Sequence, residues 1–375
     1  MIFRIVLSSN TAFSIYNFRL GLMKKLKEIG FDVIAVSPYD KYAKKIEKEG
    51  FQFFQVKNLD RKGKNPLKDI KLMFEYYNIF KKIEPDLVIN YTIKPNIYGS
   101  LACGILGIKS ISVITGLGYI FVKGGPLKFL VKTLYKLALR KNKFVIFLNK
   151  EDMNELLTLI EKDKAVLIGS SGVNLRYFSK YSCENLEKPK KRNFTFLFVG
   201  RFLKDKGIYE LIEAGKRLYH EGYLFEIWLL GDIDKGNPAS LTENEITELS
   251  KLPFIRVFSF AEDVRPYLCV SDCVVLPSYR EGMPRVLLEA MAMENPIITT
   301  DAPGCRDVCI DGENGFLVKP KDVESLYTAM KKMIEIPYEK RVSMGVAGRK
   351  IVQESFSEDI IIKRYIELIK EVINS

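Results

Sequence analysis

Residues 277–292 read PSYREGMPRVLLEAMA and follow a short apolar run at 273–276. The apolar run predicts a buried strand, and the spacing of apolar residues after Pro284 predicts a helix. Proline suits the first helical position, where its missing N–H costs nothing, and Gly282 allows a ligand to approach the backbone closely. The unpaired N–H groups and the dipole at such a helix start attract an anion such as phosphate. The stretch therefore predicts a strand–loop–helix unit that binds an anion.

Two glutamates, Glu281 and Glu289, lie eight positions apart in this stretch. Glu281 precedes the expected helix, and Glu289 lies more than one turn inside it, where it could accept hydrogen bonds from sugar or ribose hydroxyls. The alternative is that both are solvated charges. The proline and glycine around them favour a binding role.

The same strand–helix alternation extends along the chain in both directions, which predicts parallel sheets in an α/β fold. At 375 residues the chain exceeds the usual size of one core, so two doubly wound, Rossmann-like domains are expected. They would span residues 1–182 and 193–355, joined by a polar linker at 179–193 and facing each other across a cleft at their strand ends. Strands are expected at 2–7, 32–37, 87–90, 110–114, 144–148, 165–168, 195–199, 225–230, 255–258, 274–276, 297–299 and 316–318.

The positive charge is concentrated in the first half. Residues 1–185 contain 31 Lys and Arg against 16 Asp and Glu, and the remainder contains 27 against 30. Such an excess suits a nucleic acid, an anionic membrane or a diphosphate substrate. A nucleic acid is not favoured, because no recognisable module of interleaved aromatic and basic residues is present.

Cysteine and histidine usage argues against a disulfide framework and against metal or triad chemistry. Six cysteines without a secretory signal indicate a reducing compartment. The C-x3-C pairs at 269–273 and 305–309 allow a zinc site, but their apolar surroundings favour buried structural cysteines. The only histidine, His220, is expected at a helix end. The D-x-D sequence at 232–234 is a weak metal motif in this architecture.

The loop GRFLKDKG at 200–207 directly follows a predicted strand and precedes a helix. Arg201 and Lys206 would therefore point from a strand end, where an arginine fork and a lysine charge can hold a diphosphate. A solvated basic loop is the alternative. The sequence contains neither a P-loop nor a G-x-G-x-x-G after its first strand, which weighs against a dehydrogenase.

Two further features of the first half bear on ligands. Asn10, after the first strand, and the loop 115–119 are expected to line the cleft. Within 126–143, Lys128, Lys132, Lys136 and Arg140 recur every fourth residue beside an apolar side that includes Leu130, Val131, Leu134 and Leu137. This pattern is typical of a basic amphipathic helix on an anionic membrane surface, or of an ordinary domain helix with a solvated basic face.

Over essentially its whole length, the sequence resembles the retaining glycosyltransferases of family 4, which have the GT-B architecture. The resemblance rests on the E-x7-E spacing of Glu281 and Glu289, on Gly200-Arg201 with Lys206, and on NGFLV at 314–318 after PGCR at 303–306. Within the family it is most similar to bacterial enzymes that extend polyprenyl-diphosphate-linked glycans, including N-acetylgalactosaminyl transferases. IYNFR at 15–19 and TGLG at 115–118 carry this narrower similarity.

The resemblance implies a nucleotide-sugar donor in the second domain and no metal or other cofactor. Glu289 would bind the ribose, Arg201 and Lys206 the diphosphate, and Glu281 would lie near the transferred sugar. The backbone of Gly200, Gly282, Met283 and Pro284 would approach the sugar or phosphate. The implied acceptor-binding residues are Asn10, Arg19, Lys94, Thr115 and Gly116. Lys94 would stand in for a first-domain histidine that many family members carry and this chain lacks there. Helix 358–373 would cross back to the first domain.

The leading hypothesis is therefore a metal-independent retaining transferase that moves a hexose or N-acetylhexosamine, such as GalNAc or GlcNAc, from a UDP-sugar to a polyprenyl-diphosphate-linked saccharide. It would be cytoplasmic and peripherally associated with the inner face of the cell membrane. A sugar-nucleotide epimerase of the same fold is the alternative, and it would need no lipid-linked acceptor. A non-catalytic nucleic-acid-binding protein is a third hypothesis, suggested by charge alone.

Overall fold

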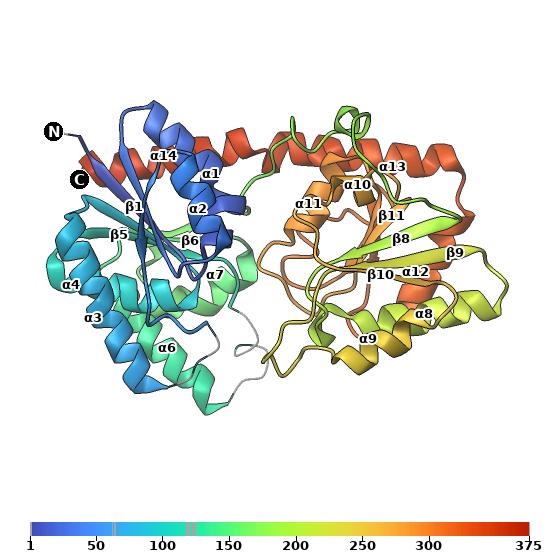
Figure 1. The fold of residues 1–375 in the computed structure, drawn as a ribbon, viewed down its shortest axis with the longest axis horizontal. Helices are drawn as coiled ribbons and strands as arrows, with labels where there is room; N and C mark the ends of the chain where they lie inside the picture. The colour runs from blue at the N-terminus through green and yellow to red at the C-terminus, as the bar shows by residue number, and fades with distance from the viewer. Residues whose placement is uncertain (1, 62, 64, 118–120, 122–124, 375) are drawn as a thin grey trace. The chain divides into compact units, whose positions relative to one another are not determined.

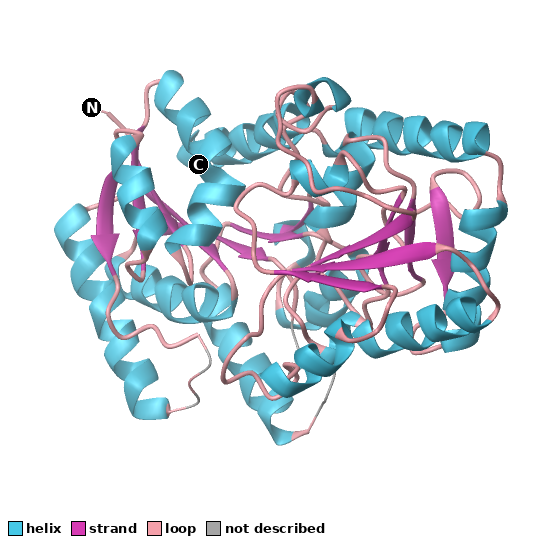
Figure 2. Cartoon of the chain, turned by 45° about the vertical axis from the view of Figure 1, so that its right-hand side comes forward, coloured by secondary structure: helices cyan, strands magenta, loops and turns pink. Residues whose placement is uncertain are grey.

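The computed structural model describes residues 2–374 except 62, 64, 118–120 and 122–124. The chain forms two compact units, the first made of Met1–Gly172 with Glu358–Ser375 and the second of Val173–Ser357. In each unit helices cover both faces of a parallel sheet (Figure 1, Figure 2). The predicted fold class, with two doubly wound Rossmann-like domains, is confirmed.

The first unit is built on a seven-stranded parallel sheet in the order β3-β2-β1-β4-β5-β6-β7. The central strands are buried at nearly every position, which explains their continuous apolar sequence. The edge strand β3 was not predicted, because its polar ends and half-exposed phenylalanines give no clear pattern. The strands are β1 (Arg4–Ser8), β2 (Asp32–Ser37), β3 (Gln52–Gln55), β4 (Leu87–Tyr91), β5 (Lys109–Ile114), β6 (Phe144–Phe147) and β7 (Ala165–Leu167).

Helices of the first unit connect these strands, and the chain's last helix packs beside the first one. Lys109 ties the end of that last helix to the sheet, because its Nζ donates to the carbonyl of Val372 at 2.9 Å. The helical segments are α1 (Ala12–Glu28), α2 (Lys41–Lys48), α3 (Pro66–Ile83), η1 (Pro95–Gly99), α4 (Ser100–Leu106), α6 (Pro126–Leu139), α7 (Lys150–Leu156), η2 (Leu157–Leu159), η3 (Lys162–Lys164) and α14 (Glu358–Asn374).

The second unit is built on a six-stranded parallel sheet in the order β10-β9-β8-β11-β12-β13. All six strands predicted for this half are present. Their apolar side chains form one core with the flanking helices, centred on residues such as Phe196 and Trp228. The strands are β8 (Phe194–Val199), β9 (Phe225–Leu230), β10 (Ile255–Phe258), β11 (Cys273–Leu276), β12 (Ile297–Thr300) and β13 (Gly315–Val318).

The helices of the second unit include the one expected after Pro284 and one that ends at His220, as predicted. The helical segments are η4 (Lys180–Cys183), η5 (Lys204–Lys206), α8 (Ile208–His220), α9 (Glu243–Ser250), α10 (Arg265–Leu268), α11 (Arg285–Ala292), α12 (Val323–Glu335), α13 (Tyr338–Ile351) and η6 (Val352–Phe356).

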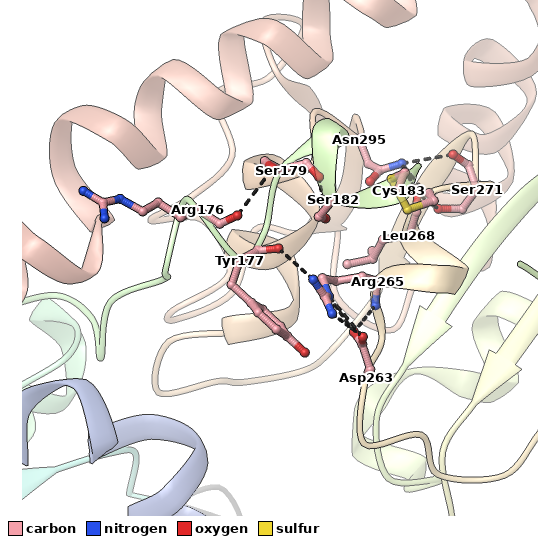
Figure 3. The surroundings of a disulfide bond; sticks show 11 residues. Arg176, Tyr177, Ser179, Ser182, Cys183, Asp263, Arg265, Leu268, Ser271 and Asn295 are labelled. Atoms are coloured by element: carbon pink, nitrogen blue, oxygen red, sulfur yellow. Dashed lines mark hydrogen bonds and ion pairs between the residues drawn. A yellow bond between two sulfur atoms is a disulfide. The ribbon is translucent and has the colours of Figure 1, made fainter. Parts of the chain in front are cut away.

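Residues 173–193, expected to end the first domain and form a linker, group with the second unit. A disulfide joins Cys183 at the end of η4 to Cys269, which directly follows α10 (Figure 3). Nearby, the guanidinium of Arg265 lies 3.6 Å from the ring centroid of Tyr177. The prediction of no disulfide is wrong here, because folding brings two Cα atoms 86 residues apart to 5.8 Å, within bridging range. The other four cysteines are buried and free.

Candidate functional site

The carboxyl ends of β8 and β11 bring Lys206 and Glu281 into contact. Lys206 ends the short turn η5 after β8, and its Nζ forms an ion pair with Oε1 of Glu281 in the loop after β11. Both side chains are largely buried, with 19% and 14% exposed. In a partly desolvated setting such a pair fixes the position of the cation more firmly than a surface pair does. The two strand ends therefore meet at one charged centre.

Arg201 at the end of β8 is held by an acidic residue from the end of β9. Its Nη1 lies 2.5 Å from Oδ2 of Asp234, which is itself buried, whereas half of the Arg201 side chain is exposed. Asp234 belongs to the D-x-D sequence considered as a metal motif. In the structure it acts as the counter-ion of Arg201 and accepts a further hydrogen bond from Asn237 at 3.0 Å. Arg201 is thus exposed to ligands and anchored at the same time.

Glu289 lies in the second turn of α11 and pairs with Arg285 one turn earlier, at 2.8 Å. Burial raises the pKa of Glu289, and the charge and hydrogen bond of Arg285 oppose that change. This partner was not predicted, although the i, i+4 spacing of an arginine and a glutamate on a helix was a usable signal.

The start of α11 differs slightly from the prediction. Pro284 has an extended backbone and is the residue before the first helical position, which Arg285 occupies. No side chain of the described residues caps this helix start. The side chain of Met283 packs against the core of the unit, while Gly282 and Gly200 are partly exposed at the ends of β11 and β8.

Loop 301–307 supports the Glu281 loop from the neighbouring strand β12. The backbone N–H of Glu281 donates to the carbonyl of Pro303 at 3.0 Å. Gly304 has φ +78°, and a Cβ there would come within 2.5 Å of the Glu281 carbonyl, so only glycine fits. Behind the loop, burial raises the pKa of the Cys305 thiol to about 12, with Glu281 acting in the same direction and Lys206 in the opposite one.

Contacts that were not predicted from the sequence fasten the Lys206 turn to the Glu281 loop. The backbone N–H of Tyr279 donates to the carbonyl of Asp205 at 2.9 Å, and the Tyr279 hydroxyl donates to Glu210 at 2.5 Å. Gly207, at φ +73°, lies so close that a Cβ would come within 2.1 Å of the Pro277 carbonyl. Spacing alone gives no signal for these contacts, because they join segments about seventy residues apart.

In the first unit, four of the five expected acceptor residues follow strands, whereas Arg19 lies buried within α1. Asn10 follows β1, while Thr115 and Gly116 follow β5, and all three are partly exposed. Leu117 of loop 115–119 is buried, while Gly118 and Tyr119 lie outside the described residues. Lys94, after β4, is held at 2.6 Å by Asp69 of α3. The expected stand-in for a histidine therefore already has a carboxylate partner.

Helix α6 differs from the predicted pattern of basic and apolar sides. Lys128 and Lys132 both pair with Glu155 of α7, at 2.9 and 2.8 Å, so they do not form a free basic face. Of the residues expected on the apolar side, Leu130 and Leu137 are exposed, together with Phe129, whereas Val131 is buried. The outward surface of α6 is therefore apolar, with Lys136 and Arg140 as its exposed cations.

Among the described residues, no group of three or more His, Cys, Asp or Glu side chains is placed to hold a metal ion. In the same part of the chain, no helix has the length and hydropathy needed to cross a membrane.

Two family models match the sequence, one in each half. Residues 4–149 match the model described as Glycosyl transferase 4-like, and residues 184–351 match Glycosyl transferases group 1. The second of these ranges includes Lys206, Glu281 and Glu289.

Two curated relatives match along nearly their whole length. The capsular polysaccharide biosynthesis glycosyltransferase CapM of Staphylococcus aureus is 28% identical, over 91% of this chain and 90% of CapM. The N,N'-diacetylbacillosaminyl-diphospho-undecaprenol alpha-1,3-N-acetylgalactosaminyltransferase of Campylobacter jejuni is 27% identical, over 99% of this chain and 100% of that enzyme. Among solved structures, Anabaena HepE in complex with UDP-glucose superposes with a TM-score of 0.78 at 18% identity, covering 98% of this chain and 99% of HepE.

Proposed function

This chain belongs to the family 4 glycosyltransferases with the GT-B fold, and from that premise we propose a specific reaction for it. The protein transfers a hexose or N-acetylhexosamine from a UDP-sugar to a polyprenyl-diphosphate-linked saccharide, with retention of configuration. The observation that carries the proposal is the Lys206–Glu281 pair at the ends of β8 and β11. Arg201 follows the same strand as Lys206, and Glu289 lies on the helix after Glu281.

In this mechanism the second unit binds the donor. Arg201 and Lys206 neutralise the negative charge that develops on the departing diphosphate. Stabilising such charge in the transition state is usually the largest single contribution to catalysis. Glu281 holds the Lys206 ammonium in place and accepts a hydrogen bond from the transferred sugar. Glu289 accepts from the ribose hydroxyls. The leaving diphosphate takes the acceptor's proton during attack on the same face, so the reaction uses no enzymic nucleophile and no metal.

The named substrates of relatives support the choice of donor and acceptor. The Campylobacter relative's name places an N-acetylgalactosaminyl group on a diphospho-undecaprenol saccharide, and HepE was solved with UDP-glucose. The epimerase alternative is not favoured, because both curated relatives are named as transferases.

A cytoplasmic site of action at the inner face of the membrane follows from such an acceptor. The exposed stripe of α6, with Phe129, Leu130 and Leu137 at 76, 52 and 58% exposure, supports contact with a bilayer. Helix α3 offers a second apolar stripe with Leu67, Ile70 and Phe74, and both helices contact η1. The proposed binding surface is therefore the apolar side chains, which would insert into the bilayer with Lys136 and Arg140 near anionic headgroups. It replaces the basic stripe expected from the sequence.

The test is product analysis with a panel of UDP- and GDP-sugars, each with and without a polyprenyl-diphosphate saccharide. A product is expected only with a UDP-sugar and the lipid-linked acceptor, and NMR of its anomeric carbon should show retention. Glu281→Gln should abolish most transfer, while the exposed Glu248→Gln serves as its matched control. Sugar turnover that does not require the acceptor would contradict the proposal.

A further inference from the structure

Arg19 of α1 is a buried cation that pairs with no carboxylate of the described residues. Only 5% of the residue is exposed. Its Nη1 donates to the adjacent Phe18 carbonyl at 3.0 Å, and its guanidinium lies 4.4 Å from the ring centroid of Tyr91. No carboxylate among the described residues pairs with it, and its buried Nε has no hydrogen-bond partner there. Stacking on one aromatic ring compensates only part of the cost of burying a charge.

Two tyrosine hydroxyls near this cation also lack hydrogen-bond partners. Tyr91 ends β4 and Tyr365 lies on α14, which packs beside α1 (Figure 1). Both side chains are at most 2% exposed, and neither hydroxyl bonds to a described residue. Burial raises the pKa of both phenols, and the Arg19 charge opposes that change. At neutral pH both therefore remain O–H groups that can donate to an anion.

The carboxyl edge of the sheet adds two more groups of this kind. Ser9 follows β1 and Thr92 follows β4, and both have buried hydroxyls without a partner in the described chain. These strands are neighbours, with Ser8 paired to Asn90. Thr92 has φ +72°, a costly backbone for a β-branched residue of the kind that is concentrated at functional sites. Ligands of doubly wound sheets bind at this edge.

Other cations of the first unit show how unusual Arg19 is. Lys94 is paired with Asp69, and Arg4 is paired with Asp32 at 2.9 Å. The start of α1 does not account for anion binding here, because Thr11 and Asp40 already accept hydrogen bonds from its first N–H groups.

We propose that Arg19, together with the hydroxyls of Tyr91 and Tyr365, binds a diphosphate group in the first unit. A guanidinium presents two parallel donors to phosphate oxygens, and the phenols add donors from two other elements. Because Arg19 is nearly enclosed, side chains at the carboxyl edge must move for the ligand to enter. The inference rests on the proposed function for its choice of ligand, the diphosphate of the lipid-linked acceptor, since the donor's diphosphate is assigned to the second unit.

Tyr365→Phe and Tyr91→Phe in the full chain test the site, because each removes only a hydroxyl that has no hydrogen-bond partner among the described residues. Isothermal titration would use three probes: farnesyl diphosphate, inorganic pyrophosphate and UDP. Each variant should weaken the binding of farnesyl diphosphate and of pyrophosphate about ten- to a hundredfold, the effect of one hydrogen bond to a charged group. UDP affinity should not change, and thermal stability should not fall, because an unsatisfied buried group is removed.

Tyr76→Phe is the matched control. Tyr76 is equally buried in the same unit, but its hydroxyl is bonded to Ser8 at 3.2 Å. It should show the reverse pattern, with lower thermal stability and unchanged diphosphate affinity. Arg19→Met should weaken diphosphate binding about a hundredfold, and Arg19→Lys should recover part of that loss because it keeps the charge without the fork.

The outcomes separate this inference from the proposed function. Unchanged diphosphate affinity in both Tyr→Phe variants, with UDP binding intact, would overturn the site and leave the transferase proposal standing. Weakened UDP but unchanged farnesyl diphosphate would overturn the acceptor assignment, because the site would then serve the donor. Failure to transfer any sugar in the product assay would instead sink the proposed function, whatever the titrations show.

Discussion

The two units share one fold but prepare their strand ends for anions in different ways. At the carboxyl edge of the second unit, Lys206, Arg201 and Arg285 are each paired with a carboxylate of the same unit. In the first unit, Arg19 of α1 is held by the ring of Tyr91 and the carbonyl of Phe18, and no carboxylate of the described residues pairs with it. The net charges of the two units also differ. The first contains 32 Lys and Arg against 19 Asp and Glu, net +13, and the second contains 26 against 27, net −1.

This difference bears on how each unit would bind a phosphate-containing ligand. Ion pairs fix cations in position before binding. A phosphate must then displace each carboxylate or share the cation with it. A cation without a carboxylate requires no exchange, but its burial costs stability until an anion arrives. We therefore expect substitutions at the paired cations to change activity and stability independently of each other.

The largest expected effect is on catalysis at the Lys206–Glu281 pair. Lys206→Ala and Glu281→Gln should each lower kcat by about 10²–10³, the usual loss when one group that stabilises the transition state is removed. The double variant should be no less active than the worse single variant, because the two side chains act as one unit. Initial rates with saturating donor and acceptor measure this.

Stability distinguishes this role from a purely structural ion pair. Each single change leaves one largely buried charge without its partner and should lower the free energy of unfolding by about 1–3 kcal/mol. The double variant should recover much of that stability but none of the activity. If activity recovers along with stability, the pair is structural and the second unit's charges are not the catalytic ones.

The next effect concerns the disulfide, which was found only in the second unit's described residues. Cys183 and Cys269 are 86 positions apart, so their bond restricts a long loop of the unfolded chain. Replacing both by serine should lower the free energy of unfolding of the second unit by roughly 3–4 kcal/mol. Trp228, the only tryptophan, is buried in that unit and reports its unfolding selectively by fluorescence.

The matched condition is the native chain under a thiol reductant, which should reproduce the loss measured for the double-serine variant. Adding the reductant to that variant should change nothing further. An equal loss in the part of the circular dichroism transition that comes from the first unit would contradict a local effect.

Strand positions in the second unit were predictable because its strands are short, apolar and separated by clear turns. The prediction that Lys206 and Glu281 share an edge followed from the rule that parallel strands end on one side of a sheet. Their direct pairing, and the pairing of Arg201 with Asp234, depends on side-chain positions that spacing does not determine.

The first unit shows what sequence patterns leave out. Helix α2 has only eight residues and three buried side chains, and β3 is a four-residue, half-exposed edge strand, so each pattern is too short to stand out in the sequence. The isolation of Arg19 cannot be predicted locally either, because it depends on α14 returning from more than 300 residues away to bring Tyr365 beside α1. The exposure of Leu130 and Leu137 likewise depends on which side of α6 faces the sheet.

A smaller effect is expected at the membrane-facing surface proposed for the first unit. Phe129→Asp and Leu137→Asp should each reduce partitioning onto anionic vesicles about tenfold, since each removes part of an inserted apolar side chain. Lys128→Glu should have little effect on partitioning, because Lys128 is engaged with Glu155. Vesicle sedimentation measures both, and a stronger effect of Lys128→Glu than of Phe129→Asp would restore the lysine stripe as the binding surface.

The smallest effect is a pH dependence of opposite sign in the two units. Burial raises the pKa of Glu289 above its ordinary value of 4.5, so the folded state binds more protons and the contribution of Glu289 to stability is lost as pH rises through the raised pKa. Hydrogen bonds from Lys132 and Lys128 lower the pKa of Glu155, so its contribution is present above pH 4.5 and is lost as pH falls. Relative to the native chain, Glu289→Gln should therefore gain stability as pH rises from 4.5 towards 7. Glu155→Gln should be less stable than the native chain above pH 4.5, and this deficit should shrink as pH falls below 4.5. Urea unfolding at several pH values, followed by Trp228 fluorescence for the second unit and circular dichroism for the first, measures both slopes. Slopes of the same sign would show that the two units do not differ in how they hold their carboxylates, because partners such as Arg285 would then dominate over burial.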